Sequence, residues 1–197
     1  MKNLIIISAP SGAGKTTLCR SIQAEVPQIK WSVSYTTRKI RKIEKNGLDY
    51  QFISELTFKK LIDKSFFAEW ENVHGFYYGT SKDLISKIIE NNEMLLLEMD
   101  VKGALSIKKL YPNKTFSIFI TPPSIDHLRK RLQKRGADSK YRINIRLRRF
   151  KEEMKYVSRF DFNLLNDDLE KAKDQLLDII LKIKKGDNNG VKNNTIS

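Results

Sequence analysis

LIIISAPSGAGKTTL (residues 4–18) joins a short apolar run to a loop of small residues and then to a helical pattern. The apolar run predicts a buried strand. After the loop, Leu18, Ile22 and Val26 recur at helical spacing, and Pro27 ends the pattern. A strand, a tight loop and a helix in this order are typical of the βαβ units that build a parallel sheet.

The loop APSGAGKT (residues 9–16) matches the P-loop pattern, with Ala9 at the position of the first glycine. Its glycines let backbone N–H groups turn toward phosphate oxygens, its lysine brings a cation to the β- and γ-phosphates, and its threonine hydroxyl can bind Mg²⁺. Because the loop lies between a predicted strand and a predicted helix, it favours a nucleoside triphosphate site over an unliganded turn. The loop residues assigned to ATP are Ser11, Gly12, Ala13, Gly14, Lys15, Thr16 and Thr17, with Thr16 as the metal ligand.

Composition indicates one globular unit with an anionic partner. A chain of 197 residues can bury one sizeable core that carries small inserted subdomains. Its 37 Lys and Arg against 23 Asp and Glu give a formal charge of +14, which favours phosphorylated metabolites, nucleic acid or acidic membranes without choosing among them. The single cysteine, Cys19, excludes an intramolecular disulfide, and no stretch approaches transmembrane length. We expect a cytoplasmic protein that binds no nucleic acid and no membrane.

The later part of the chain continues the alternation of strands and helices. Further strands are predicted at 94–99, 116–120 and 162–165, each followed by a helical stretch. The last helix is predicted to open at Asp167, with Glu170 in capping-box spacing. The sequence therefore predicts an α/β fold, a three-layer P-loop core around a central parallel sheet.

Two regions interrupt this alternation. One is rich in Ser, Thr and Tyr with short alternating pieces, which predict a small, mainly β insertion. The other is an Arg-dense helical pair with an apolar stripe of Ile143, Leu147 and Phe150. The predicted division is 1–31, 81–123 and 156–186 for the core, 32–80 for the insertion, 124–155 for the helical pair and 187–197 for a flexible tail.

Several further motifs follow the phosphate loop in order. Together with the loop they resemble guanylate kinase, the P-loop nucleoside monophosphate kinase that moves phosphate from ATP to GMP. The resemblance covers nearly the whole chain, and it implies ATP and GMP as substrates, Mg²⁺ bound with ATP, 32–80 as a GMP-binding subdomain and 124–155 as a lid. The motifs are SYTTRKIRKIEKNGLDY (34–50), FAEW (67–70), YYGT (77–80), LEMD (97–100), RLQKRG (131–136), INIRL (143–147) and NDDL (166–169).

The insertion also contains residues whose chemistry suits a GMP acceptor. Two arginines and two tyrosine hydroxyls can surround a phosphate dianion. The Glu69 carboxylate can accept from both N1–H and the exocyclic amine of guanine, while Ser34 and Thr80 can bond O6 and the remaining edge. Adenine presents the wrong donor pattern to such a carboxylate. The residues assigned to GMP are Ser34, Arg38, Arg41, Tyr50, Glu69, Tyr78 and Thr80 and, by the resemblance, Asp100.

Phosphoryl transfer depends on alignment and on cations more than on covalent chemistry, since a GMP phosphate oxygen is already an anionic nucleophile. The resemblance assigns three arginines to a lid that closes over ATP and shields the reaction from water. It also places Asn166 against the adenine of ATP. The expected catalytic set is Lys15, Arg38, Arg131, Arg135 and Arg146, of which Arg131 and Arg135 also bind ATP.

Three residues depart from the family's pattern. The family generally has Pro and Gly where this chain has Ile40 and Ile43, which affects the conformation of the loop that holds Arg41. Glu98 stands where the family usually has Asp, and its extra methylene can shift a metal or water contact.

Three other interpretations stay open at this point. The chain could be a non-catalytic domain that binds phosphorylated peptides through the acceptor site, although the intact GAGKT sequence argues against this. It could be a P-loop kinase for another acceptor, such as a ribose phosphate, although Glu69, Ser34 and Thr80 favour recognition of a base. Nucleic-acid binding is supported only by net charge.

Overall fold

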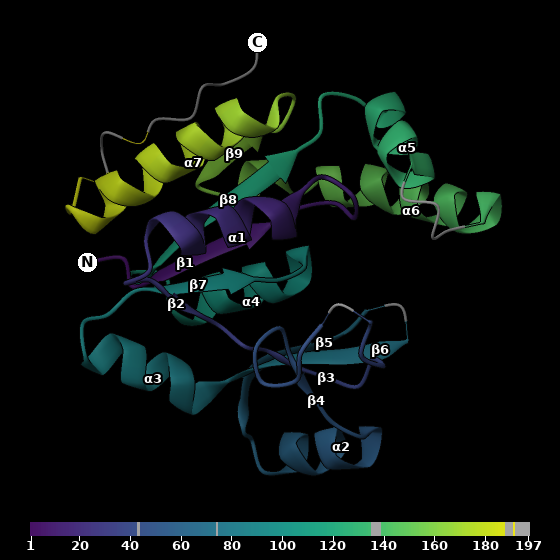
Figure 1. Cartoon of the computed structure of the whole chain (residues 1–197). Coiled ribbons are helices and arrows are strands. Elements are labelled where there is room, and N and C mark those ends of the chain that lie inside the picture. Colours follow the sequence, from purple (N-terminus) through teal and green to yellow (C-terminus); the bar gives the residue numbers. More distant parts are fainter. Residues whose placement is uncertain (43, 74, 135–138, 188–190, 192–197) are drawn as a thin grey trace.

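The computed structural model describes residues 1–42, 44–73, 75–134, 139–187 and 191. Its centre is a parallel five-stranded sheet in the order β2-β7-β1-β8-β9 (Figure 1). The predicted parallel-sheet α/β fold is thereby confirmed. The strands are β1 (Leu4–Ser8), β2 (Lys30–Trp31), β7 (Leu95–Glu98), β8 (Thr115–Thr121) and β9 (Phe162–Leu165).

The central strands β1 and β8 are buried along their whole length because helices cover both faces of the sheet. Successive side chains of a strand point to opposite faces. Accordingly, Ile5 and Ile7 of β1 join one core cluster, whereas Leu4 and Ile6 join another. Each face of a buried parallel sheet needs its own helical layer, and the chain therefore forms three layers.

The helices of the outer layers are amphipathic in the way that the sequence predicts. On one face, α1 (Lys15–Glu25) packs beside α7 (Leu169–Lys184), and the other face is covered by α4 (Val101–Leu110) with part of α3 (Lys82–Glu90) (Figure 1). Cys19 of α1 is fully buried and free, as a small apolar side chain would be.

The start of α7 corrects one prediction. The N-cap is Asp168 and not Asp167, because the Asp168 carboxylate accepts a hydrogen bond from the Lys171 N–H at 3.0 Å. That bond satisfies one of the N–H groups that a helix leaves open at its first turn. The Asp167 side chain is mostly exposed and lies 4.0 Å from His127 Nδ1.

The second sheet lies beside the core and is mixed, in the order β4-β3-β6-β5 (Figure 1). Its strands are β3 (Tyr35–Thr36), β4 (Gln51–Phe52), β5 (Phe67–Val73) and β6 (Phe76–Ser81), with helix α2 (Glu55–Asp63) between β4 and β5.

Helix α2 was not predicted, although its sequence carries an N-cap residue. Ser54 caps it by accepting from the Thr57 N–H at 3.1 Å. Phe58 is fully buried and stacks on Phe67 with 4.4 Å between ring centroids. The aromatic contact attaches the helix to the second sheet and stabilises it.

The Arg-dense region forms the expected helical pair, α5 (Ile125–Lys134) and α6 (Lys140–Met154). Ile143 and Leu147 of α6 are buried with Leu128 and Leu132 of α5, and Phe150 is partly buried against them. A short 3₁₀ turn, η1 (Val157–Arg159), leads from α6 to β9. Within the described part of the chain, no helix is both long enough and apolar enough to cross a bilayer.

Candidate active site

The phosphate loop lies between β1 and α1 at the carboxyl edge of the parallel sheet, where open α/β sheets bind ligands. Gly12 and Gly14 have φ angles of 97° and 96°, a region in which side-chain-bearing residues are strained. Gly14 is the N-cap of α1 and has no side chain that could occupy the free N–H groups of the first turn. These N–H groups and the helix dipole make the loop a site for anionic oxygens.

The functional side chains of the loop face Glu98, at the end of the neighbouring strand β7. Thr16 Oγ1 donates to Glu98 Oε1 at 2.6 Å, and Lys15 Nζ lies 3.9 Å from the same oxygen. Lys15 Nζ also donates to the Met99 carbonyl at 3.0 Å. The approach of this carboxylate to the phosphate loop follows from the β1–β7 register, which pairs Ile7 with Glu98.

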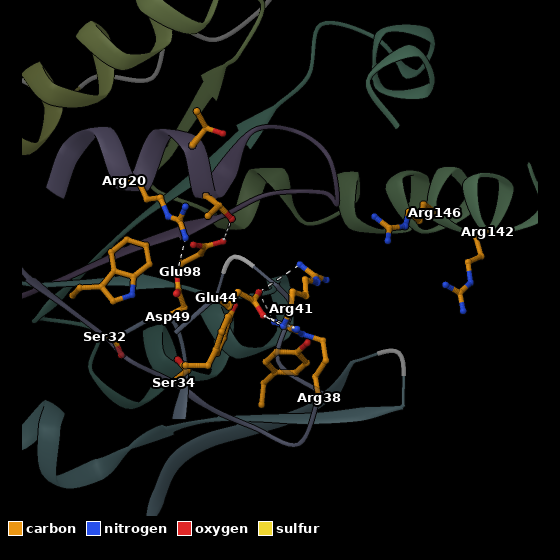
Figure 2. A pocket seen from close by; sticks show the side chains of 15 residues that line it. Arg20, Ser32, Ser34, Arg38, Arg41, Glu44, Asp49, Glu98, Arg142 and Arg146 are labelled. Carbon is orange, nitrogen blue, oxygen red and sulfur yellow. Dashed lines mark hydrogen bonds and ion pairs between the residues drawn. The ribbon is translucent and has the colours of Figure 1, made fainter. Parts of the chain in front are cut away.

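Two adjoining cavities, of about 660 and 280 Å³, lie between the phosphate loop and the second sheet. Figure 2 shows side chains from α1, from the second sheet's loops and from α6 converging on the larger cavity. Both cavities are lined by Thr16, Ser34, Arg41, Tyr50, Tyr78, Glu98 and Arg146. The predicted donor and acceptor residues therefore face the same space.

Glu69 lies in the smaller cavity in a closely fitting environment. Thr80 Oγ1 donates to Glu69 Oε1 at 2.6 Å, and Glu69 Oε2 lies so close to Gly103 that a Cβ there would come within 2.8 Å of it. Burial raises the pKa of Glu69 to about 7; the charges of Asp100 and Glu71 act in the same direction and the Thr80 hydrogen bond opposes them. Asp100 caps α4 by accepting from the Gly103 N–H at 2.8 Å.

The predicted phosphate-acceptor residues lie next to this carboxylate: Arg38 lines the larger cavity, and Arg41, Tyr50 and Tyr78 line both cavities. Tyr50 and Tyr78 pack edge to face with ring centroids 5.9 Å apart, and the Arg38 guanidinium lies 5.5 Å from the Tyr50 ring centroid. Burial raises the pKa of Tyr50 far above its usual range, which keeps its hydroxyl a hydrogen-bond donor. Arg41 is largely exposed, and Ser34 is buried at the floor of both cavities.

The predicted lid arginines differ in where they lie. Arg146 of α6 donates from Nη1 to Ser11 Oγ at 2.8 Å, which joins α6 to the phosphate loop. Arg131 lines neither cavity, because its guanidinium donates to the carbonyls of Asn166 and Asp167 at 3.0 and 3.3 Å. Arg135 lies outside the described residues.

Asn166 supports the phosphate loop from beneath. Its side-chain Nδ2 donates to the Ala13 carbonyl at 2.7 Å, and it lies directly against Gly14, where any Cβ would collide with it. The Asn166 Oδ1 atom is buried without a hydrogen-bond partner in the described structure. The remaining loop residue assigned to ATP, Thr17, lines the larger cavity.

Sequence reasoning missed several residues of the larger cavity. The sequence motifs assign no site role to Glu44 and Asp49, which lie within 34–50, or to Arg20 of α1 and Arg142 of α6. The available signal was the position of both carboxylates within that basic motif. Of the family departures, Ile40 is half exposed, and Ile43 lies outside the described residues.

A phosphate loop that faces a buried carboxylate and a separate cluster of arginines and tyrosines defines a P-loop kinase with a phosphorylated, base-bearing acceptor. Comparison with known proteins makes the assignment specific. The family model described as guanylate kinase matches residues 1–183, and the chain belongs to the guanylate kinase family.

Individual relatives agree with this assignment. The chain is 41% identical over 181 residues to a guanylate kinase of Caldanaerobacter subterraneus subsp. tengcongensis, covering 92% of this chain and 87% of the relative. It is 45% identical over 177 residues to a guanylate kinase of Aromatoleum aromaticum, covering 90% and 86%. The crystal structure of guanylate kinase from Anaplasma phagocytophilum superposes with a TM-score of 0.75 at 28% identity, covering 91% of this chain and 85% of that one.

Proposed function

We propose that this chain catalyses the reversible, Mg²⁺-dependent transfer of the ATP γ-phosphate to GMP, giving ADP and GDP. The observation that carries the proposal is that the Glu69–Thr80 pair and the phosphate loop open onto the same space, with arginines and tyrosines between them. A site that only bound a phosphorylated peptide would have no need of the intact lysine and threonine of the phosphate loop.

The GMP site follows from the geometry of the second sheet. The Glu69 carboxylate, ionised when it binds guanine, accepts from N1–H and the exocyclic amine, and the Thr80 hydroxyl holds it in place. Ser34 bonds a further polar atom of GMP. Four side chains bind the phosphate of GMP, namely those of Arg38, Arg41, Tyr50 and Tyr78. Asp100, at the N-terminus of α4, is assigned a place next to the base.

The donor site is the phosphate loop with its neighbours. Backbone N–H groups from Ser11 to Thr17 bind the phosphates of ATP, and Lys15 binds the β- and γ-phosphates. Asn166, which supports the loop, lies on the adenine side, and the lid arginines Arg131, Arg135 and Arg146 approach ATP as the lid closes. We assign the core, GMP-binding and lid roles to the ranges predicted above, and we place the enzyme in the cytoplasm.

The residues around Thr16 fit a magnesium ion. Mg²⁺ prefers oxygen ligands and is held in phosphotransferases by one or two protein groups together with substrate phosphates. Thr16 Oγ1 and the Glu98 carboxylate, which are 2.6 Å apart beside Lys15, offer such oxygens. Thr16 would hold the ion directly, with Glu98 next to it. When bound, the ion would neutralise negative charge on the phosphates.

Transfer itself needs alignment of the two substrates and neutralisation of charge. A phosphate oxygen of GMP attacks the γ-phosphorus of ATP. The bond from that phosphorus to the oxygen that bridges the β- and γ-phosphates breaks at the same time, and ADP leaves. Lys15 on the donor side and Arg38 on the acceptor side flank the transferred group, and Arg146 reaches it from α6. Closing the lid excludes water, which would otherwise compete as acceptor.

ADP formation across a panel of nucleoside monophosphates, with ATP and Mg²⁺, tests the proposal. GMP should be the preferred acceptor, and AMP should react at least about 100-fold more slowly because it leaves the buried carboxylate unpaired. Lys15→Ala should abolish turnover while retaining GMP binding, whereas Lys59→Ala, on the exposed side of α2, should change neither. Equal use of AMP, or turnover only with a ribose phosphate, would overturn the assignment.

A further inference from the structure

The Glu44 carboxylate lies beneath the two arginines of the acceptor site, and neither the sequence motifs nor the proposed reaction gives it a role. Its side chain is only 9% exposed. A buried carboxylate requires partners, and here both partners come from the expected phosphate-binding set. Figure 2 shows the dashed contacts that run from Glu44 to Arg38 and Arg41.

The contact with Arg38 is bidentate. Arg38 Nη1 donates to Glu44 Oε2 at 2.9 Å and Nη2 donates to Oε1 at 2.8 Å. Nη1 donates in addition to the Lys39 carbonyl at 2.7 Å. This parallel arrangement fixes both the position and the plane of the guanidinium.

The same carboxylate also holds the segment that carries Arg41. Oε2 accepts from the Arg41 backbone N–H at 2.8 Å, and Oε1 lies 3.7 Å from Arg41 Nη1. Burial on its own would raise the pKa of Glu44, yet the hydrogen bonds from Arg38 and from the Arg41 N–H outweigh it and lower that pKa. Glu44 is therefore ionised at neutral pH, with both arginines around it.

The N–H groups of Arg38 that do not bond to Glu44 or to the Lys39 carbonyl are suited to a phosphate. A guanidinium has five N–H groups. Glu44 and the Lys39 carbonyl take three of them, and the remaining two, on Nε and Nη2, form one edge of the planar fork. The Tyr78 hydroxyl, itself assigned to the acceptor phosphate, also contacts this guanidinium.

We propose that Glu44 is a positioning residue of the acceptor site, which orients the Nε–Nη2 edge of Arg38 and the backbone at Arg41 toward the phosphate of GMP. This inference rests on the proposed function. Glu44 itself touches no substrate and acts through the two arginines. Its effect is on the phosphate of the acceptor and not on the guanine base, which Glu69 and Thr80 bind elsewhere in the cleft.

The direction in which GMP affinity changes in one variant distinguishes a positioning role of Glu44 from a purely electrostatic effect of its charge. Glu44→Gln removes a negative charge near the phosphate, so Coulomb's law alone predicts tighter GMP binding. A positioning role predicts weaker GMP binding. The neutral amide can no longer accept two charge-assisted hydrogen bonds, so the plane of the Arg38 guanidinium is no longer fixed. We expect the Kd of GMP to rise about tenfold or more.

Calorimetric titration of Glu44→Gln with GMP and with guanosine, which lacks the phosphate, tests the proposal. GMP affinity should fall while guanosine affinity stays within about twofold of the wild-type value. Glu55→Gln, an exposed carboxylate of the same insertion paired with Lys59, is the matched control and should change neither. Circular dichroism melting of both variants monitors the fold.

The outcomes distinguish this inference from the proposed function. Unchanged or tighter GMP binding by Glu44→Gln overturns the positioning role alone. An equal loss for GMP and guanosine also overturns it, since that pattern indicates general damage to the subdomain. If the wild-type chain binds guanosine as tightly as GMP and forms no ADP, both the proposed function and the positioning role fail.

Discussion

Arg20 of α1 and Asp49 of the loop before β4 form an ion pair of 2.6 Å that joins the P-loop helix to the second sheet. The other Asp49 oxygen accepts from the Lys45 N–H at 2.8 Å. That N–H bond is the largest cause of the lowered pKa of Asp49, and Arg20 adds to it. Both residues line the larger cavity and lie side by side there (Figure 2). The ion pair therefore links the P-loop core, to which we assign ATP, to the insertion to which we assign GMP.

The strength of this link can be measured with a double-mutant cycle of Arg20→Met and Asp49→Asn. Because Arg20 is half exposed, the coupling energy should be below about 1 kcal/mol. It should shrink between 50 and 500 mM salt, as the Debye length shortens. Urea unfolding of the four proteins at both salt concentrations checks this. Strictly additive effects at low salt would show that the two side chains do not interact in solution.

The pKa of Glu69 predicts a pH-dependent acceptor affinity. Only the ionised carboxylate can accept from both guanine donors, and at a pKa of about 7 roughly nine in ten copies are protonated at pH 6. The KM for GMP should therefore rise about tenfold from pH 8 to pH 6, while the KM for ATP changes little. Phosphate protonation of GMP contributes only about a factor of two at pH 6. In Glu69→Gln the KM for GMP should keep only this roughly twofold change between pH 8 and pH 6. A tenfold rise of that KM in the variant would contradict the role of Glu69.

Gly103→Ala should displace the Glu69 carboxylate without harming the fold. The added methyl would come within 2.8 Å of Glu69 Oε2, the far end of a side chain that can move. Alanine is a better helix former than glycine by about 1 kcal/mol, so thermal stability should be kept. We expect the KM for GMP to rise about tenfold with an unchanged KM for ATP. As a control on the same helix, Ser106→Ala should leave the KM values for GMP and ATP unchanged. An unaffected KM for GMP in Gly103→Ala would argue against base recognition by Glu69.

Arg146→Lys should reduce turnover more than binding. Lysine keeps the charge but cannot donate to Ser11 and still present a planar fork to the transferring phosphate. We expect kcat to fall about 100-fold or more, with modest changes in both KM values. Steady-state kinetics against Arg148→Lys, an exposed arginine of the same helix, provide the comparison. A kcat within a few-fold of wild type would remove Arg146 from the catalytic set.

The long core elements could be predicted because each carries a complete periodic signal. The strand predicted at 162–165 coincides with β9, and the apolar run at the start of the chain is β1. The two-residue strands β2, β3 and β4 are too short to show a period, and they are defined by their partners in the sheet. Helix α2 escaped prediction because a region rich in β-forming residues surrounds its helical segment.

For the site, the sequence determined which chemical groups are present and the fold determined how they pair. Lys15, Thr16 and Glu69 could be assigned because local motifs define their chemistry. Glu98 reaches Thr16 across 82 residues of sequence, and Arg20 reaches Asp49 across 29, through neighbouring strands and loops that no local pattern describes. Arg131 likewise bonds to backbone carbonyls, a partner that the residue types alone do not indicate.

By itself, the sequence determined the α/β class, the phosphate loop and the family, because each is expressed in contiguous residues with a fixed spacing. Only the tertiary structure decided that Glu44 binds both Arg38 and the Arg41 backbone, and that Glu69 is enclosed between Thr80 and Gly103. The physical reason is that orientation, burial and pKa depend on distances between segments. Those distances exist only once the second sheet lies against the P-loop core.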